Sequence, residues 1–241
     1  SLKSSNTIQT APVILAFEAS TKQLSVAVHV NGSVLAMQKI EAPFGQAAEL
    51  VPLAMRTLAE VGVEFSGLSH VAAGCGPGSF TGLRVSLAAA KGVCLAQNII
   101  GLGISGLEAM AFSSSGILNG LPVLCIADTR RGNVYAQLFA SDMTPQGTIF
   151  EAQIDQLPLL VPAPICADGL MLVGFGVLAA KMAFAAKGLA ATPVSFGNKQ
   201  DVTSVDAGMI ATMAAKKIMR GDFPPLTPLY LADPHLGPKK K

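Results

Sequence analysis

Apolar positions follow two kinds of pattern along this chain of 241 residues, and the two kinds alternate. Short apolar runs bounded by turn residues, which are typical of buried strands, occur at 13–17, 24–30, 33–40, 70–74, 121–128, 133–140 and 170–176. Longer segments with helical spacing lie at 46–61, 82–97, 105–116 and 204–221. Two successive series each open with antiparallel strands and continue into helices. The pattern therefore predicts a duplicated α/β fold whose second copy is degraded.

Turn and capping residues support the limits of these segments. Asn31 and Gly32 tolerate positive φ, so the apolar runs on either side of them are expected to pair as a hairpin. Ser105 is expected to cap a helix, with Glu108 as its capping-box partner. Pro52 lies inside a helical segment and is expected to kink it or to mark a restart.

The two series define two lobes. The expected boundaries are residues 12–104 with 203–234 for the first lobe, 105–202 for the second lobe, and 1–11 and 235–241 for the tails. The last long helix returns to the first lobe, and either Ser204 or Thr203 is expected to cap it.

The two leading helices are apolar on more than one flank. In the 82–97 segment, Leu83, Leu87, Ala90 and Cys94 form one stripe and Val85, Ala89, Val93 and Ala96 form another. A helix that is apolar nearly all round is covered on more than one side. Either the two helices cover each other in a monomer, or a second protein covers them. The residues expected at such an interface are Leu50, Ala54, Leu58, Val85, Ala89, Val93 and Ala96.

A glycine-rich loop, GCGPGSFTG at 74–82, joins an expected strand to an expected helix. Loops of this kind can hold an anion at the helix N-terminus, but this loop lacks the lysine of G-x-x-x-x-G-K-[ST]. Pro77 and Phe80 also break the G-x-G-x-x-G register. A phosphate cradle and a tight structural connection therefore both stay open. Ser79 lacks the spacing of a G-x-S-x-G nucleophile and is expected to cap the helix or to satisfy the loop backbone.

Composition and charge exclude several classes of protein. Charged residues make up 13% of the chain and the net charge is +2, so a basic nucleic-acid-binding surface is not expected. The four cysteines have no zinc-site spacing and favour a reducing, cytosolic compartment. The apolar segment 170–186 is short for a membrane span and contains Lys181, so we expect a strand, a turn and a buried helix there.

Metallopeptidase chemistry needs two histidines one helical turn apart. The three histidines, His29, His70 and His235, do not have that spacing, so no metal site is expected.

Four segments carry a resemblance to a known family. The stretch GCGPGSFTGLRVSLAAAKGVCLA (74–96) resembles the G-x-GPGSFTG-[LV]-R signature of the TsaB family, also called YeaZ. The segments ILAFEAST (14–21), DTRRGNVYAQLF (128–139) and PLYLAD (228–233) are similar to further family segments and follow in the same order. The motif-loop residues that match are Gly76, Pro77, Gly78, Ser79, Phe80, Thr81, Gly82 and Arg84.

The resemblance implies an actin/hexokinase-like (ribonuclease H-like) α/β fold, with duplicated lobes of mixed sheets flanked by helices. It implies a cytoplasmic, non-catalytic scaffold subunit in the synthesis of threonylcarbamoyladenosine beside the tRNA anticodon. Its expected partners are the catalytic paralogue TsaD and the small ATPase TsaE. The chain would form a homodimer when alone and meet tRNA only through the complex, and no membrane is involved.

The resemblance also implies where a nucleotide would lie. In such a fold ATP or ADP with magnesium would meet Glu18, Ser20, Thr21, Gly174 and Gly176. The family usually has aspartate where this chain has glutamate, and the longer side chain would displace the metal geometry. A small-molecule kinase or ATPase of the same fold, using this acid and Asp128, is the alternative function, and a metalloprotease is a weaker one.

Overall fold

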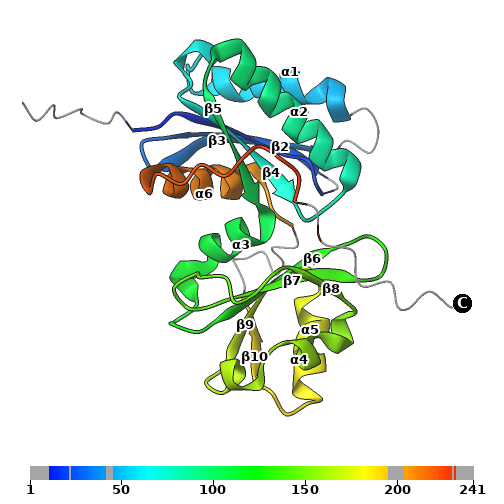
Figure 1. The fold of residues 1–241 in the computed structure, drawn as a ribbon. Coiled ribbons are helices and arrows are strands. Elements are labelled where there is room, and N and C mark those ends of the chain that lie inside the picture. Colours follow the sequence, from blue (N-terminus) through cyan, green and yellow to red (C-terminus); the bar gives the residue numbers. More distant parts are fainter. Residues whose placement is uncertain (1–10, 22, 42–45, 195–203, 230, 232–241) are drawn as a thin grey trace, which may run out of the picture.

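Two five-stranded sheets, one above the other in Figure 1, form the centres of two lobes. The computed structural model describes residues 11–21, 23–41, 46–194, 204–229 and 231. The neighbouring strands in each sheet are partly antiparallel and partly parallel, so both sheets are mixed. The expected duplicated α/β fold is confirmed.

The first sheet has the strand order β3-β2-β1-β4-β5. Its strands are β1 (Ile14–Glu18), β2 (Gln23–Val30), β3 (Ser33–Glu41), β4 (His70–Gly76) and β5 (Ile100–Ser105). β1, β2 and β3 pair antiparallel, whereas β4 and β5 join parallel to β1. Asn31 and Gly32 connect β2 to β3 with φ values of 50° and 84°, which confirms the expected hairpin.

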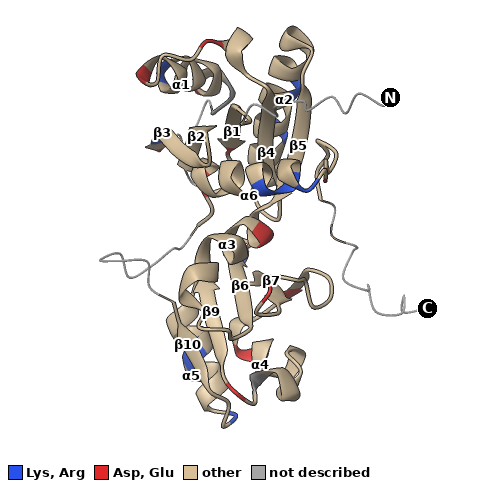
Figure 2. Ribbon diagram, turned by 90° about the vertical axis from the view of Figure 1, so that its left-hand side faces the viewer, with Lys and Arg blue, Asp and Glu red and all other residues tan. Residues whose placement is uncertain are grey.

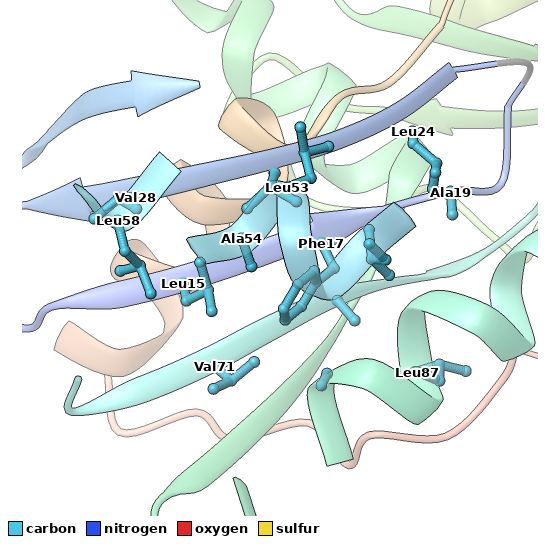
Figure 3. Packing of buried hydrophobic residues seen from close by; sticks show 14 of the residues in the cluster. Leu15, Phe17, Ala19, Leu24, Val28, Leu53, Ala54, Leu58, Val71 and Leu87 are labelled. Carbon is cyan, nitrogen blue, oxygen red and sulfur yellow. The ribbon is translucent and has the colours of Figure 1, made fainter. Parts of the chain in front are cut away.

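Helices cover both faces of the first sheet (Figure 1). On one face lie α1 (Gln46–Glu60) and α2 (Phe80–Gln97), and on the other lies α6 (Ala207–Met219). Because side chains alternate along a strand, Leu15 and Phe17 of β1 join the core beneath α1 and α2. Ile14 and Ala16 join the core beneath α6. Figure 3 shows the first of these cores at close range.

Two local expectations for the helices of the first lobe have different outcomes. α1 continues as one helix through Pro52, so a restart there is wrong, whereas a kink stays a prediction. The expected cap of α6 is wrong. α6 is capped by Asp206, whose side chain accepts a hydrogen bond from the backbone N–H of Met209 at 3.0 Å. Ser204 precedes the cap, and Thr203 lies outside the described residues. Aspartate is as good an N-cap as serine, and its position decides where the helix begins.

The second sheet has the order β10-β9-β6-β7-β8. Its strands are β6 (Val123–Asp128), β7 (Val134–Phe139), β8 (Phe150–Ala152), β9 (Leu170–Gly174) and β10 (Ala191–Pro193). Helices α4 (Leu157–Leu160) and α5 (Val177–Ala185) pack against it. Short 3-10 turns lie at Phe65–Gly67, Ser115–Ile117, Ile154–Gln156 and Ala163–Cys166. The second lobe is smaller than the first in three elements: the strands β8 and β10 and the helix α4 are all short.

Helix α3 (Gly106–Ser114) lies between the two sheets (Figure 1). Ala109 packs in the core under α6, whereas Met110 packs against the second sheet. Ser105 caps α3 by accepting a hydrogen bond from the Glu108 N–H at 3.4 Å, as expected. The Glu108 carboxylate pairs with Lys217 of α6 at 2.9 Å, which ties α3 to the first lobe. The expected lobe boundaries remain a prediction.

The apolar segment 170–186 forms β9, a turn and α5, so the expected order of elements is confirmed. The expectation that the helix is buried is wrong, because only one side of α5 packs on the sheet and Leu178 and Met182 are exposed by 67% and 74%. None of the helices within the described residues combines the length and the apolar character that crossing a membrane requires.

A C-terminal strap, residues 223–229, runs along the outer edge of β5. Its Pro224 carbonyl accepts a hydrogen bond from Gly103 at 3.1 Å, and its Leu229 N–H donates to the Cys75 carbonyl at 2.8 Å. The Phe223 ring stacks on His70 with centroids 6.0 Å apart. The strap covers an edge that would otherwise present unpaired backbone groups to a second chain.

Ending the chain after residue 222 should remove these contacts and expose the edge of β5. We expect a loss of about 3 kcal/mol from two hydrogen bonds and partly buried apolar side chains, together with concentration-dependent association through the free edge. Urea unfolding and size-exclusion chromatography measure both effects. A chain ending after residue 231, which keeps the strap, is the control, and equal stability of the two truncated chains would contradict the role given to the strap.

Candidate functional site

The motif loop connects the end of β4 to the start of α2. Ser79 is the N-cap of α2, and its hydroxyl accepts a hydrogen bond from the Gly82 N–H at 3.3 Å, which confirms its expected capping role. The Ser79 N–H in turn donates to the Ser20 carbonyl at 2.9 Å. The loop is thus bonded to the turn that follows β1.

The glycines of this loop allow it to lie directly on that turn. A Cβ on Gly78 would come within 2.5 Å of the Ser20 Cβ, and one on Gly82 would overlap the Ala19 carbonyl oxygen. No side chain larger than hydrogen fits at these positions without moving the backbone. Of the two roles considered for the loop, these contacts support the tight structural connection.

Glu18 lies at the end of β1, and its side chain is buried, with an exposure of 1%. Its Oε1 accepts hydrogen bonds from the backbone N–H of Ser20, at 2.5 Å, and from the Ser20 hydroxyl. Its Oε2 has no partner among the described residues and faces Gly74, where a Cβ would overlap it. Burial raises the pKa of the Glu18 carboxyl to about 7, although the bonds from Ser20 act in the opposite direction.

A cleft of about 410 Å³ lies between the lobes. Its lining residues are Ser20, Thr21, Gln23, Glu41, Pro77, Gly78, Gly106, Leu107, Met110, Ala127, Asp128, Arg130, Phe175, Ser204 and Val205. The floor is largely apolar, and the charged groups are the carboxylates of Glu41 and Asp128 and the guanidinium of Arg130. Asp128 also accepts a hydrogen bond from the Arg130 N–H at 2.7 Å.

The structure brings together only part of the expected nucleotide set. Ser20 and Thr21 line the cleft, whereas Glu18 is buried outside its lining. Gly174 and Gly176 flank Phe175, which does line the cleft, and have φ values of 108° and 68°.

The groups present do not fit magnesium-ATP. A triphosphate needs several cationic groups or a metal held by ionised acids. The described lining offers one guanidinium, and its two carboxylates belong to no metal-binding group among the described residues. Glu18, the acid expected to organise the metal, is buried at the end of β1 with a pKa of about 7 and does not line the cleft. The two acids needed by the kinase alternative therefore do not line one cavity.

The histidines and cysteines are the remaining candidates for metal or thiol chemistry. Within the described ranges, no three His, Cys, Asp or Glu side chains come together in a metal-binding arrangement. His29 lies on β2 and His70 on β4, and His235 is outside the described residues. Burial raises the pKa of the Cys75 thiol to about 12 and also raises that of Cys125, so both thiols stay protonated.

The outer face of α1 and α2 carries a second hollow, of about 420 Å³. We call it the α1–α2 groove, and it is lined by Val51, Phe80, Thr81, Arg84, Val85, Ala88 and Ala89. Large apolar side chains are exposed in the groove, Val51 by 47% and Phe80 by 59%, and elsewhere on the same two helices, Met55 by 58% and Leu95 by 86%.

The expected interface set divides into two groups in the structure. Leu50, Ala54 and Leu58 are buried in the chain's own core, with exposures of 0%, 0% and 2%, so they offer no surface to a partner. Figure 3 shows Ala54 and Leu58 directed toward the β1 strand that carries Leu15 and Phe17. Val85 and Ala89 line the groove, Val93 is half-buried, and Ala96 is exposed.

Sequence reasoning left several groove residues out of the expected interface. Val51 and Met55 belong to the second apolar stripe of α1, and only the structure shows that this stripe faces outward. Phe80 was assigned to the motif loop rather than to the surface. The available signal is its place on α2 eight positions, or about two helical turns, before Ala88.

Comparisons with known proteins agree with this architecture. The family model described as "TsaD: tRNA N6-adenosine threonylcarbamoyltransferase" matches residues 45–160. The tRNA threonylcarbamoyladenosine biosynthesis protein TsaB of Escherichia coli (strain K12) is 32% identical over 122 residues, which are 51% of this chain and 52% of that protein. The chain thus spans about half the length of the curated relatives it matches.

Solved structures match over more of the chain. YeaZ from Pseudomonas aeruginosa superposes with a TM-score of 0.71 and 23% identity, over 91% of this chain and all of that one. A protein described as similar to peptidase YeaZ, from the same organism, superposes with a TM-score of 0.74 and 22% identity, over 92% of this chain and 100% of that chain. The two mixed sheets flanked by helices are the actin/hexokinase-like ATPase fold.

Within that fold class, the named sequence matches are to TsaB proteins and the structural matches with the higher TM-scores are to YeaZ. These matches support the resemblance of the chain to the TsaB (YeaZ) family.

Proposed function

We propose that this chain is a non-catalytic subunit in the synthesis of threonylcarbamoyladenosine in tRNA, and that it acts by pairing with a TsaD-type subunit. The names of its curated relatives support the pathway. The observation that carries the pairing is the α1–α2 groove, an exposed apolar surface on the first lobe.

The groove has the properties of a protein-binding surface. A contiguous exposed apolar patch on a monomer usually marks an interaction site. The lining combines the small side chains of Ala88 and Ala89 with the larger apolar side chains of Val51 and Phe80. A helix of a second protein can therefore approach α2 closely, because interaxial distance depends on the size of the contacting side chains.

The cleft supports the non-catalytic part of the proposal. Its lining does not fit magnesium-ATP, so a chemical role would have to belong to the partner subunit. The net charge of +2 gives little attraction for a polyanion, so tRNA would be held mainly elsewhere in the complex.

The proposal has three further parts. The complex also contains a TsaE-type ATPase, the chain pairs with itself when the partner is absent, and the protein is located in the cytoplasm. The free cysteines Cys75, Cys94 and Cys125 support a reducing compartment.

Ala88→Arg should abolish binding of the TsaD-type subunit while leaving the chain folded. Ala88 is exposed in the groove, so a long charged side chain fits the free monomer but fills the space of a partner helix. We expect affinity to fall at least about a hundredfold, because the substitution places a desolvated charge and a steric clash at an interface centre. Isothermal titration calorimetry with the partner of the same organism measures the change.

Ala179→Arg is the matched control, because Ala179 is an exposed alanine on α5 of the other lobe. It should bind the partner like the unmodified chain. Unchanged affinity of the Ala88→Arg chain, with circular dichroism confirming that it is folded, would contradict the assignment of the groove as the binding surface.

A further inference from the structure

Arg84 is the charged residue in the lining of the α1–α2 groove. Its guanidinium carbon lies 3.8 Å from the centre of the Phe80 ring, one helical turn earlier on α2. A guanidinium stacked on an aromatic face is held in a fixed plane, and its N–H groups remain directed outward along the edge. The side chain is therefore ordered before any partner arrives.

Among the described residues, no carboxylate forms an ion pair with this guanidinium. The ion pairs formed by the described residues join Lys39 to Asp206, Arg131 to Glu151, and Lys217 to Glu108 and Asp222, and none includes Arg84. α2 contains Arg84 and Lys91 but neither Asp nor Glu, as Figure 2 shows by its lack of red. An exposed apolar groove thus contains a guanidinium that lies over the Phe80 ring and has no ion-pair partner among the described residues.

We propose that the α1–α2 groove selects a partner helix that presents a carboxylate beside a small apolar side chain, and that Arg84 binds this carboxylate. The inference rests on the proposed function and adds the chemistry by which the partner is recognised. A guanidinium can bind a carboxylate through two parallel hydrogen bonds. Because the Phe80 stack already fixes the guanidinium, less side-chain freedom is lost on binding.

The same chemistry distinguishes a foreign partner from a second copy of this chain. If two copies met through α2 alone, Arg84 and Lys91 of one would face those of the other, and like charges across an interface weaken binding. A second copy could offer an exposed carboxylate from α1, at Glu49 or Glu60, only by crossing α1 over α2. The groove is thus better matched to an acidic partner helix than to itself.

The test measures the affinity of the TsaD-type subunit for the full chain carrying Arg84→Gln, Arg84→Glu or Lys91→Glu. Lys91→Glu is the matched control, since Lys91 is exposed on the same helix and lies outside the groove lining. Loss of a charge-assisted contact should weaken binding about tenfold for Arg84→Gln and about a hundredfold for Arg84→Glu. Lys91→Glu should change affinity by less than about threefold, as expected for a charge at the rim.

Further outcomes separate this inference from the proposed function. Restored binding of the Arg84→Glu chain by a partner in which one carboxylate is replaced by lysine would support it directly. If the Arg84→Glu chain binds the partner as well as the Lys91→Glu chain does, while Ala88→Arg abolishes binding, the groove is the binding surface but Arg84 does not bind a partner carboxylate. If the chain pairs with itself and both Arg84→Glu and Glu49→Gln abolish that pairing, the occupant is a second copy and the inference is overturned.

Discussion

Gly82→Ala should destabilise the first lobe by about 3 kcal/mol or more, the size expected when a core contact is overpacked against atoms that cannot move aside. The added Cβ would overlap the Ala19 carbonyl oxygen, which belongs to the backbone of the turn after β1. Either α2 moves away from the turn or the turn itself shifts. Urea unfolding at neutral pH measures the loss.

The same helix offers a matched control at Gly92. A Cβ there would meet nothing within 4 Å, so Gly92→Ala should stabilise the protein by about 0.5–1 kcal/mol through helix propensity alone. The two substitutions are chemically identical and lie on one helix, so their difference isolates the close packing of the motif loop. Similar stabilities for both variants would show that the loop does not depend on this contact.

Glu18→Gln should remove a pH dependence of stability. The unfolded carboxyl, with a pKa of 4.5, loses its proton before the buried one, whose pKa is about 7. Between these two pH values the carboxyl ionises in the unfolded state but stays protonated in the folded state, so rising pH lowers the free energy of unfolding. The contribution of Glu18 is thus complete below about pH 4.5 and is lost as pH rises through about 7, a change of about 3 kcal/mol for a shift of this size.

Glutamine stays neutral and has nearly the same shape, so the Glu18→Gln chain should lack this slope. It should match the unmodified chain near pH 4 and exceed its free energy of unfolding by about 3 kcal/mol near pH 8. Urea unfolding across this range provides the measurement. Glu49→Gln, at an exposed carboxylate of α1, controls for the loss of one negative charge. If the free energies of unfolding of the unmodified and Glu18→Gln chains changed with pH in parallel, the pKa of the Glu18 carboxyl would be the same in the folded and unfolded states, which contradicts this prediction.

The sequence was sufficient to predict features that depend on neighbouring residues. The hairpin at Asn31 and Gly32 and the caps at Ser79 and Ser105 follow from local turn and capping chemistry, and the structure confirms them. The cap of α6 was placed two residues early because Ser204 and Asp206 are both good N-caps. Local patterns do not say which of two nearby caps is used.

The candidate site depends on contacts between distant segments, and there prediction was incomplete. Periodicity finds two apolar stripes on α1 but does not show which stripe faces the sheet, so Leu50 was assigned to the interface and Val51 was not. The turn acid Glu18 was expected near a nucleotide, and its burial results from the motif loop packing on Ser20. The cleft lining joins α3 residues such as Met110 to loops of both lobes, which no local pattern relates.

The return of the chain to the first lobe has a consequence for folding during synthesis. Helix α6 binds the first sheet through a hydrogen bond from the Ala207 N–H to the Ser25 hydroxyl, across 182 positions of sequence, and the strap closes β5 later still. The first sheet is translated before the second but therefore waits for segments that are translated after it. The other sheet is built from one continuous stretch, so it can mature earlier, because contacts close in sequence form faster than distant ones.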